Sequence, residues 1–435
     1  MASLLTGHFR EWFERRGYHY SEGIEGEDAD WRQMEESLED FRRRYAVHCI
    51  PEEVTGMLWK ALRRKTDKVY DEVAVCPSFA EYCSAISHLP KDSAAGISGL
   101  SYNMLKILPP TLSRAMYEAM AEIWRNKEIP QFWKWRWILP IPKEADPTLN
   151  DLRPLSLFET TRKLWFALVL TKMRAVWARE GLLHPAQSMF IKGRSMDLSV
   201  LALMNVLETA KEWKADVFLS SWDITKAFDR VPVQAQIWAY VRLGIPSTVA
   251  EYLVAFDQDC KAVVWTPLAC QAWKRNRYDG LVDLGYSPQV GMAQGNVDST
   301  DKWAAFFDPL LCALDMVDEG HFYYQSEGGD SRPAEDTAAA DDLVSFAGTH
   351  RALQAKADIV SGFCLIFGLE IAVKKKLRCF HLSWGNGERD APDHILIHLQ
   401  GWTPHPVPLQ RDGLMKHLGV RWDMSVDNDT QKRNS

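Results

Sequence analysis

The sequence lacks both a long apolar segment and a surplus of basic residues. The longest apolar runs, such as "LWFALVL" from Leu164, are far too short to cross a bilayer. The start, "MASLLTGHFREWFERR", has no extended apolar core and becomes charged quickly, which argues against a secretory signal. The formal net charge is -7, whereas dedicated nucleic-acid-binding domains are usually basic. A nucleic-acid-binding role would therefore depend on local basic patches, or on metal ions that offset acidic ligands.

Closely spaced cysteine pairs are absent as well. None of the eight cysteines belongs to a CxxC pair, so a zinc knuckle is not indicated. They are scattered, and most stand beside apolar residues, which is typical of reduced thiols in an intracellular protein. The eight are Cys49, Cys76, Cys83, Cys260, Cys270, Cys312, Cys364 and Cys379.

What is present is the composition of a globular protein. The chain has 435 residues, of which 46% are hydrophobic and 25% charged, enough for a sizeable core and for two or three domains. Residues 1–75 are charged and helical in pattern, with apolar residues from Trp31 to Tyr45 at the spacing of an amphipathic helix. The runs "FRRR" and "KALRRKTDK" within this region are typical of a solvated helix face rather than of an RNA contact.

The remaining pattern mixes helices and strands in an α+β order. We expect helices over 111–126, 162–180, 197–213 and 230–256, with the second and third of these well buried. An exposed strand is expected within 127–143, a strand over 216–224, a strand pair over 261–273 and a hairpin over 337–348. A helix over 351–371 should run into a further strand, a short strand should follow over 414–423, and 321–337 has loop composition.

Three aspartates stand where strands end or turn. The strand over 216–224 delivers Asp223, and the hairpin carries Asp341 and Asp342 at its turn. Two adjacent carboxylates repel, and a buried one needs a partner. A divalent cation resolves both problems, because Mg²⁺ prefers oxygen ligands, and two such ions can clamp the attacking and leaving oxygens of a phosphoryl displacement. Taken alone, however, an Asp-Asp pair is also a common turn, and a strand-ending aspartate a common cap.

A series of motifs in order resembles the reverse transcriptases of non-LTR (LINE-type) retrotransposons. "WDITKAFDRV" from Trp222 looks like motif A of that family, and "GMAQGNVDS" from Gly291 looks like motif B. "AADD" ending at Asp342 looks like motif C, and "FGLEIAVKKK" and "HLGV" are similar to motifs D and E. Upstream, "WILPIPK", "LRPLSL", "AAGISGLSYNMLKIL" and "HPAQSMFIKGRSMDLSV" resemble the fingers motifs and the segment leading into the palm, so the resemblance covers roughly residues 90–425.

The resemblance implies a right-hand polymerase fold with fingers and palm, in which a small antiparallel palm sheet is backed by helices. It assigns 1–75 to a charged helical extension, 76–160 to the fingers and 161–425 to the palm, with a fingers insertion at about 233–290. Residues 426–435 would form a tail, and the thumb would be absent. We therefore expect a fragment of a larger element-encoded protein, or a decayed copy, with other domains such as an endonuclease missing.

The resemblance also implies roles for the acidic residues. Asp223 and Asp341 would bind two Mg²⁺ ions, for which Mn²⁺ could substitute, and Asp342 would support them. Phe228 would stack under the sugar and exclude a 2′-OH, so that deoxynucleotides are used; core packing is the alternative for its ring. Asp229 is expected to be a turn or cap acid rather than a ligand.

Basic and polar residues of the motifs would bind the nucleotide. Lys143 and Arg153 would contact the triphosphate, although a surface ion pair is the alternative for each. Gln294 and Gly295 would let the backbone approach the templating base pair, because glycine has no Cβ. Lys375 would protonate the leaving pyrophosphate as a general acid, but it lies in a lysine run that is also typical of solvated surface.

Three alternating tryptophans suggest a further contact with nucleic acid. Trp133, Trp135 and Trp137 flank Lys134 and Arg136, and an exposed strand with that mixture could touch the template by stacking. Most of the eighteen tryptophans stand at helical spacing and are expected in the core.

The function that the resemblance implies is RNA-directed DNA synthesis by a nucleotidyltransferase that copies retroelement RNA. Its partners would be an RNA template, a DNA primer and deoxynucleotide triphosphates, with no membrane, and the nucleus would be its location. One alternative is an inactive polymerase-fold remnant that acts at most as an RNA-binding module, because the family usually has an aromatic residue at Ala339 and proline at Ala293. A relative that copies RNA into RNA, or an intron maturase, is the other alternative.

Overall fold

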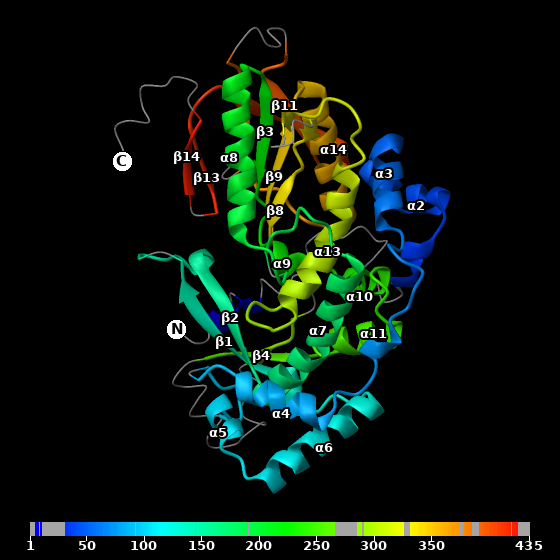
Figure 1. Ribbon diagram of the computed structural model, residues 1–435, viewed down its shortest axis with the longest axis vertical. Helices are drawn as coiled ribbons and strands as arrows, with labels where there is room; N and C mark the ends of the chain where they lie inside the picture. The colour runs from blue at the N-terminus through cyan, green and yellow to red at the C-terminus, as the bar shows by residue number, and fades with distance from the viewer. Residues whose placement is uncertain are drawn as a thin grey trace. The chain divides into compact units, whose positions relative to one another are not determined.

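The computed structural model describes residues 5–7, 9–10, 31–91, 93–143, 145–189, 191–265, 285–288, 291–325, 331–373, 377–384, 391–418 and 420–424. The chain divides into two compact units. Unit 1 comprises Met1–His19, Arg64–Glu180 and Phe228–Lys302, and unit 2 comprises Tyr20–Arg63, Gly181–Ala227 and Trp303–Ser435. Helices and strands are interspersed in both, so the predicted α+β class is confirmed (Figure 1).

Unit 1 contains most of the expected helices of the first half of the chain. They are α4 (Phe79–His88), α5 (Tyr102–Lys106), α6 (Pro110–Asn126), α7 (Thr160–Glu180), α10 (Val233–Arg242) and α11 (Ser247–Ala255), with the 3-10 turns η3 (Asp71–Val73), η4 (Gln131–Lys134) and η5 (Leu149–Asp151). A capping box begins α4, because Ser78 Oγ accepts the Glu81 amide and the Glu81 carboxylate accepts the Ser78 amide. The region predicted to be helical over 230–256 contains two helices, α10 and α11.

A four-stranded sheet in the order β2-β1-β4-β5 lies in unit 1. Its strands are β1 (Trp135–Pro142), β2 (Leu152–Phe158), β4 (Lys261–Val264) and β5 (Gly285–Tyr286). β1 pairs with β2 antiparallel and with β4 parallel, so it is an interior strand. The prediction of an exposed strand here was wrong for its first half, where Trp135 and Trp137 pack with Ile97 and Val263.

The tryptophan hypothesis is wrong for the same reason. Trp133, Trp135 and Trp137 are only 1%, 3% and 6% exposed, so their rings cannot stack on a nucleic-acid base. Arg136, between two of them, is also buried and lies over the Phe158 ring. The alternation of aromatic and basic residues therefore reflects two covered faces of an interior strand.

Unit 2 is built on a six-stranded sheet in the order β11-β12-β10-β3-β9-β8. The strands are β3 (Val217–Trp222), β8 (Thr337–Ala339), β9 (Asp342–Ala347), β10 (Arg378–Leu382), β11 (His394–Leu399) and β12 (Thr403–Gln410). All neighbouring pairs are antiparallel except β10 and β12, which are parallel. The expected antiparallel sheet is therefore larger than predicted and mixed at one pair.

Helices cover both faces of this sheet (Figure 1). On one face, Leu203, Val206 and Ala210 of α8 (Met196–Trp213) pack in a core with Leu219 of β3 and Val344 of β9. On the other face α14 (His350–Ile366) packs against β3, β9 and β11, and α3 (Glu52–Leu62) packs on the outside of α14. α8 was expected to be well buried, but its outer side is exposed, as at residues Leu198, Leu201 and Met204.

Several smaller elements differ from the prediction. The helix expected from Trp31 to Tyr45 is split into η1 (Trp31–Glu35) and α2 (Leu38–Arg44), because Ser37 caps a new start by accepting the Asp40 amide. The short strand expected over 414–423 is the hairpin β13 (Leu414–His417) and β14 (Val420–Asp423). The expected loop over 321–337 contains β6 (Tyr323–Gln325) and β7 (Ser331–Pro333).

Three further elements lie elsewhere in the described chain. They are η2 (Ala46–His48), η7 (Gln400–Trp402) and α13 (Ser299–Leu314), whose first residues belong to unit 1 and the rest to unit 2. Of the strand pair expected over 261–273, β4 is present, and 266–273 lie outside the described residues. Among the described helices, none combines the length and apolarity needed to traverse a bilayer.

Candidate active site

The register of β3 and β9 brings two of the predicted acidic residues to neighbouring positions in unit 2. Trp222, the last residue of β3, pairs with Leu343, the second residue of β9. Asp223 directly follows β3 and Asp342 directly precedes Leu343, so extending this antiparallel register by one position would set Asp223 across from Asp342. The fold therefore brings together parts of the chain that are more than a hundred residues apart.

Strand alternation puts both residues on the same face of the sheet. Leu219 and Val344 lie in the core under α8, and Asp223 and Asp342 continue the same alternate series along their strands. Asp342 is exposed and Asp223 is half-buried, at the end of the sheet. Like charges placed opposite each other destabilise a strand pair unless a cation lies between them.

The turn between β8 and β9 carries the third acid, Asp341. Its loop has two residues, Ala340 and Asp341, since Ala339 pairs with Asp342. Ala340 has φ 60°, so the first central residue has the positive φ of a type II′ hairpin, a position usually occupied by glycine. The predicted hairpin is confirmed, with Asp341 in the turn and Asp342 as the first residue of β9.

The backbone of Asp223 is also fixed on its other side. The amide of Ala372 donates to the Asp223 carbonyl (2.9 Å), the amide of Thr225 donates to the Glu370 carbonyl (2.7 Å), and Ile224 forms a bridge with Ile371. The motif D segment therefore extends the sheet beside motif A. Lys375, the predicted general acid in this segment, lies outside the described residues.

The carboxylate oxygens at this end of the unit 2 sheet suit a hard divalent cation. Carboxylate oxygens are the ligands that Mg²⁺ and Mn²⁺ prefer, and Asp223, Asp341 and Asp342 are brought to one end of one sheet. Within the ranges that the structure describes, however, no three His, Cys, Asp or Glu side chains are gathered closely enough to hold a metal ion. The backbone arrangement thus fits a metal site, while the carboxylates themselves do not form a closed ligand set.

Unit 1 carries the residues predicted to bind the nucleotide. Arg153 of β2 pairs with Ile141 of β1, and the amide of Lys143 donates to the Asp151 carbonyl at 2.9 Å. Lys143 and Arg153 therefore lie near the same end of one hairpin, and both are exposed. Neither pairs with an acidic side chain among the described residues, so the surface-ion-pair alternative finds no support there.

The Gln294-Gly295 turn lies against the edge of β2. The Ser156 amide donates to the Gln294 carbonyl (2.8 Å), and Gly295 has φ 99°. A Cβ at Gly295 would stand 2.7 Å from the Ser156 carbonyl oxygen, so glycine is required for both conformation and space. Within the chain, the close backbone approach at this glycine is to β2, whereas the predicted approach was to the templating base pair.

Phe228 belongs to the short helix α9 (Ala227–Arg230). Its carbonyl accepts the Met292 amide (2.6 Å), and its side chain is half-buried. Gly291, with φ 88°, packs so closely on Asp229 that a Cβ would lie 2.6 Å from the Asp229 carbonyl oxygen. The segment carrying Phe228 is thus joined to the segment leading into Gln294.

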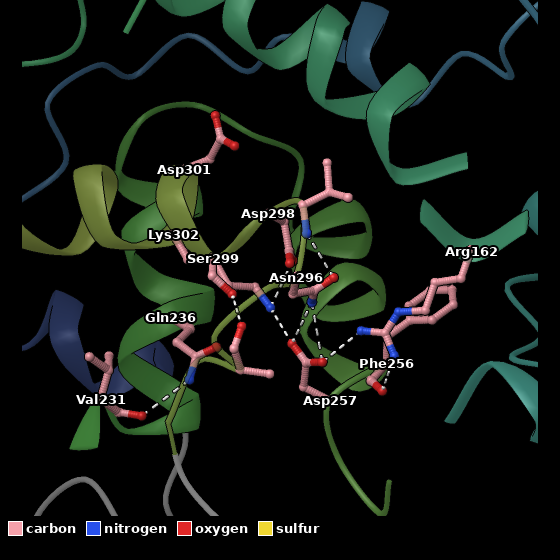
Figure 2. Close-up of polar contacts among 12 residues, drawn as sticks. Arg162, Val231, Gln236, Phe256, Asp257, Asn296, Asp298, Ser299, Asp301 and Lys302 are labelled. Carbon is pink, nitrogen blue, oxygen red and sulfur yellow. Dashed lines mark hydrogen bonds and ion pairs between the residues drawn. The ribbon is translucent and has the colours of Figure 1, made fainter. Parts of the chain in front are cut away.

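A buried polar network holds the chain after Gln294-Gly295 (Figure 2). Asp257 accepts Arg162 Nη2 at 2.6 Å and Lys302 Nζ at 2.6 Å, and Lys302 also pairs with Asp298 at 2.8 Å. The side-chain amide nitrogen of Asn296 lies 3.4 Å from Asp257 Oδ1. Two cations and two anions are therefore enclosed together, with Arg162, Asp298 and Lys302 fully buried.

The charges in this network set the protonation of its members. Burial would raise the pKa of Asp257, but Lys302 and Arg162 outweigh burial and hold that pKa well below its usual range. Burial raises the pKa of Asp298. Burial alone would lower the pKa of Lys302, but the carboxylates of Asp257 and Asp298 outweigh burial and raise that pKa. Sequence reasoning missed Arg162 and Asp257, because no motif links them and they are 95 residues apart.

Comparison with known proteins decides the family. Residues 141–386, more than half of the chain, match the family described as reverse transcriptase (RNA-dependent DNA polymerase). The chain belongs to the reverse transcriptase family. The predicted resemblance is confirmed, and the region matched contains Asp223, Gln294, Gly295, Asp341 and Asp342.

Three curated relatives are named as proteins of transposons or retrotransposable elements. The chain is 26% identical over 357 residues to the "Probable RNA-directed DNA polymerase from transposon BS" of Drosophila melanogaster, covering 79% of this chain and 35% of that protein. It is 23% identical to the "Transposon TX1 uncharacterized 149 kDa protein" of Xenopus laevis (63% of this chain, 20% of that protein). It is also 23% identical to the "Retrovirus-related Pol polyprotein from type-1 retrotransposable element R2" of Popillia japonica (54% and 31%).

These matches support a reverse transcriptase of the non-LTR type. The chain spans between a fifth and about a third of the length of these relatives. Reverse transcriptases generally use divalent metals, act on nucleotides and copy an RNA template.

Proposed function

We propose that this chain is an RNA-directed DNA polymerase that copies retroelement RNA by two-metal nucleotidyl transfer. The observation that carries the proposal is the pairing of Trp222 with Leu343, which brings the neighbouring residues Asp223 and Asp342 to one end of the sheet, with Asp341 in the adjoining turn, in a chain of the reverse transcriptase family. Three carboxylates at one end of one sheet are hard to explain by packing alone, because adjacent like charges are unfavourable.

The acidic residues would hold the metal ions. Asp223 and Asp341 would be ligands of two Mg²⁺ ions, with Asp342 in support and Mn²⁺ as a substitute. Such ions lower the barrier for attack of a primer 3′-OH on the α-phosphate and stabilise the leaving pyrophosphate. The bent backbone at Ala340 would aim the carboxylate of Asp341 toward the same end of the sheet as Asp223.

Unit 1 would supply the nucleotide contacts. The exposed side chains of Lys143 and Arg153 would bind the triphosphate, since neither is neutralised by a described acidic partner. The Gln294-Gly295 turn would contact the templating base pair, and the Phe228 ring would exclude a 2′-OH. Lys375 would protonate the leaving pyrophosphate.

The larger organisation follows from the same proposal. The six-stranded sheet of unit 2 would be the core of the palm, and the fingers would include 76–160, with an insertion at about 233–290. An RNA template, a DNA primer and deoxynucleotide triphosphates would be the substrates, within a larger element-encoded protein that acts in the nucleus.

The direct test is primer extension on an RNA template with Mg²⁺. Wild type should exceed Asp341→Ala by roughly 100-fold or more, because the variant loses a metal ligand. Asp318→Ala, an exposed acid in the same unit, is the matched control and should retain activity. Equal background from wild type and Asp341→Ala would favour the inactive remnant, which the alanines at 339 and 293 suggest.

The choice of nucleotide tests the Phe228 assignment separately. Wild type should use deoxynucleotides and reject ribonucleotides, and Phe228→Val should admit ribonucleotides because a smaller side chain leaves room for a 2′-OH. Ready ribonucleotide incorporation by wild type would contradict the assignment and favour an RNA-copying enzyme.

A further inference from the structure

The segment Ala186–Ser188 lies along the outer side of β8, the edge strand of the unit 2 sheet. The Ala338 amide donates to the Ala186 carbonyl (2.9 Å), and the Ser188 amide donates to the Ala338 carbonyl (2.8 Å). This segment therefore acts as a short parallel neighbour of β8 and brings Gln187 to the β8–β9 turn. The sequence indicated only that the segment leads into the palm.

The side chain of Gln187 binds both polar groups of Ala340. Its Oε1 accepts the Ala340 amide at 3.0 Å, and its Nε2 donates to the Ala340 carbonyl at 3.3 Å. Gln187 is 2% exposed, so this amide–peptide pairing takes place away from water. A primary amide is suited to such a contact because it presents one acceptor and two donors side by side.

The residue that Gln187 holds is the conformationally disfavoured one. Ala340 has φ 60°, where an L-residue other than glycine, asparagine or aspartate is uncommon. Asp341 follows in the turn and Asp342 begins β9, so the orientation of the Ala340 peptide fixes the direction in which both carboxylates leave the turn. Strained backbone of this kind persists only where surrounding contacts impose it.

The backbone that carries Gln187 is itself anchored. Arg194 Nη1 donates to the Gln187 carbonyl (2.9 Å) and to the His184 carbonyl (2.6 Å). The Ser188 hydroxyl lies 2.8 Å from the Ser199 hydroxyl of α8, and Thr337 of β8 donates to the same Ser199 oxygen at 2.6 Å. Gln187 is thus held between α8 and β8 and is not a flexible surface side chain.

We infer that Gln187 is a positioning residue for the acidic turn: it locks the Ala340 peptide and thereby aims Asp341 and Asp342. The inference rests on the proposed function for its catalytic consequence, but the clamp itself is a property of the fold. Among the described residues, the Gln187 side chain forms its hydrogen bonds with Ala340, so its effect on the acids would act through that residue.

Amide hydrogen exchange tests the clamp without any need for activity. In Gln187→Ala, the Ala340 amide loses its acceptor and should exchange roughly tenfold faster or more in the peptide spanning 337–346. Gln187→Glu retains the acceptor and loses the donor to the Ala340 carbonyl, so it should give an intermediate rate. Unchanged exchange in both variants would overturn the inference.

Gln354 provides a matched control. It clamps a backbone residue in the same way, because its Nε2 donates to the Leu396 carbonyl (2.9 Å) and its Oε1 accepts the Leu396 amide (2.8 Å), but it lies on α14 against β11. Gln354→Ala should leave exchange over 337–346 and polymerase activity unchanged. If it reduced activity as much as Gln187→Ala does, general destabilisation would explain both and the positioning role would be rejected.

Activity measurements complete the test through a double substitution. Gln187→Ala should lower kcat for primer extension roughly tenfold with little change in the KM for deoxynucleotide, since nucleotide contacts lie elsewhere. Adding Ala340→Gly should restore a large part of that loss, because glycine adopts positive φ without a clamp. Absence of rescue would overturn the positioning role. Absence of any wild-type activity would reject the proposed function, while the exchange result would still decide the clamp.

Discussion

At the scale of single residues, two glycines of unit 1 separate the effect of a positive φ from the effect of atoms that would clash with a Cβ. Gly295 and Gly99 both have positive φ, 99° and 78°, but only Gly295 lies against other atoms. The Ser156 carbonyl oxygen would be 2.7 Å from a Cβ at Gly295, whereas nothing lies within 4 Å of one at Gly99. The two positions therefore form a matched pair.

We expect Gly295→Ala to destabilise unit 1 by about 2–4 kcal/mol and Gly99→Ala by only about 1 kcal/mol. The difference should come from the clash with β2, which also breaks the bond between the Ser156 amide and the Gln294 carbonyl. Denaturant unfolding of both variants measures the difference, and exchange of the Ser156 amide locates it. Equal destabilisation would show that the turn moves away from β2 without cost.

Individual residues also show how far the sequence could be interpreted. Asp223, Asp341 and Asp342 could be placed together because strand ends, a turn and the family motifs all agreed. Trp135 and Trp137 were misplaced, because alternation with basic residues resembles an exposed strand, and only the neighbours of β1 reveal that both faces are covered. Gln187 had no signal of its own, since its contact with Ala340 joins residues 153 positions apart.

At the scale of elements, one buried ion pair joins α14 to the acidic hairpin, which is formed by β8 and β9 and carries Asp341 and Asp342. Lys356 Nζ lies 2.7 Å from Asp336 Oδ1 and donates to the Phe346 carbonyl at 2.9 Å. The same Asp336 oxygen accepts the Phe346 amide at 3.0 Å. Lys356 and Asp336 are both about nineteen-twentieths buried, so each charge depends on the other for solvation.

Lys356→Met should therefore lower the free energy of unfolding by about 3–5 kcal/mol, because it leaves the Asp336 carboxylate buried without its cation. The double variant Lys356→Met, Asp336→Asn should be less destabilised than this single variant, since asparagine is neutral and still accepts the Phe346 amide. Chemical denaturation of the single and double variants measures the coupling. If the loss of unfolding free energy in the double variant equalled the sum of the losses from the two separate substitutions, Lys356 and Asp336 would not stabilise each other.

Element boundaries were predictable where local signals were strong. The hairpin over 337–347 followed from its small residues and turn, and α6 followed from its helical period. The helix expected from Trp31 to Tyr45 is interrupted because the Ser37 side chain caps the start of a new helix. The helical spacing of the apolar residues continues across this break, so the spacing alone does not show it. The parallel pairing of β10 with β12 depends on where a distant strand returns, and no local pattern encodes it.

At the scale of the whole molecule, 58 acidic and 51 basic residues give the formal charge of -7. RNA is a polyanion, so binding by this chain must overcome an overall repulsion. Divalent cations bound at the acidic hairpin would remove part of that repulsion at the proposed active site.

At constant ionic strength, replacing Na⁺ with Mg²⁺ should strengthen binding of a single-stranded RNA roughly fivefold, or by about 1 kcal/mol. Asp223→Asn with Asp342→Asn should abolish this gain, because the cation site is lost. Asp318→Asn with Glu319→Gln changes the net charge equally at two exposed acids and should preserve it. Filter binding with and without EDTA gives the comparison, and identical behaviour of the two double variants would indicate ordinary screening.

The tandem order of the two acids in the hairpin makes the alignment of β9 with β3 decisive for which acid stands beside Asp223. Consecutive residues on a strand face opposite ways, and a slip of one position exchanges the two sides. If β9 shifted by one residue against β3, Asp341 would arrive at the place across from Asp223 that Asp342 now occupies. Val344 and Phe346, which pack in the core with α8, would then turn to the opposite face of the sheet, so burial of β9 enforces the alignment that sets which of the two acids stands beside Asp223.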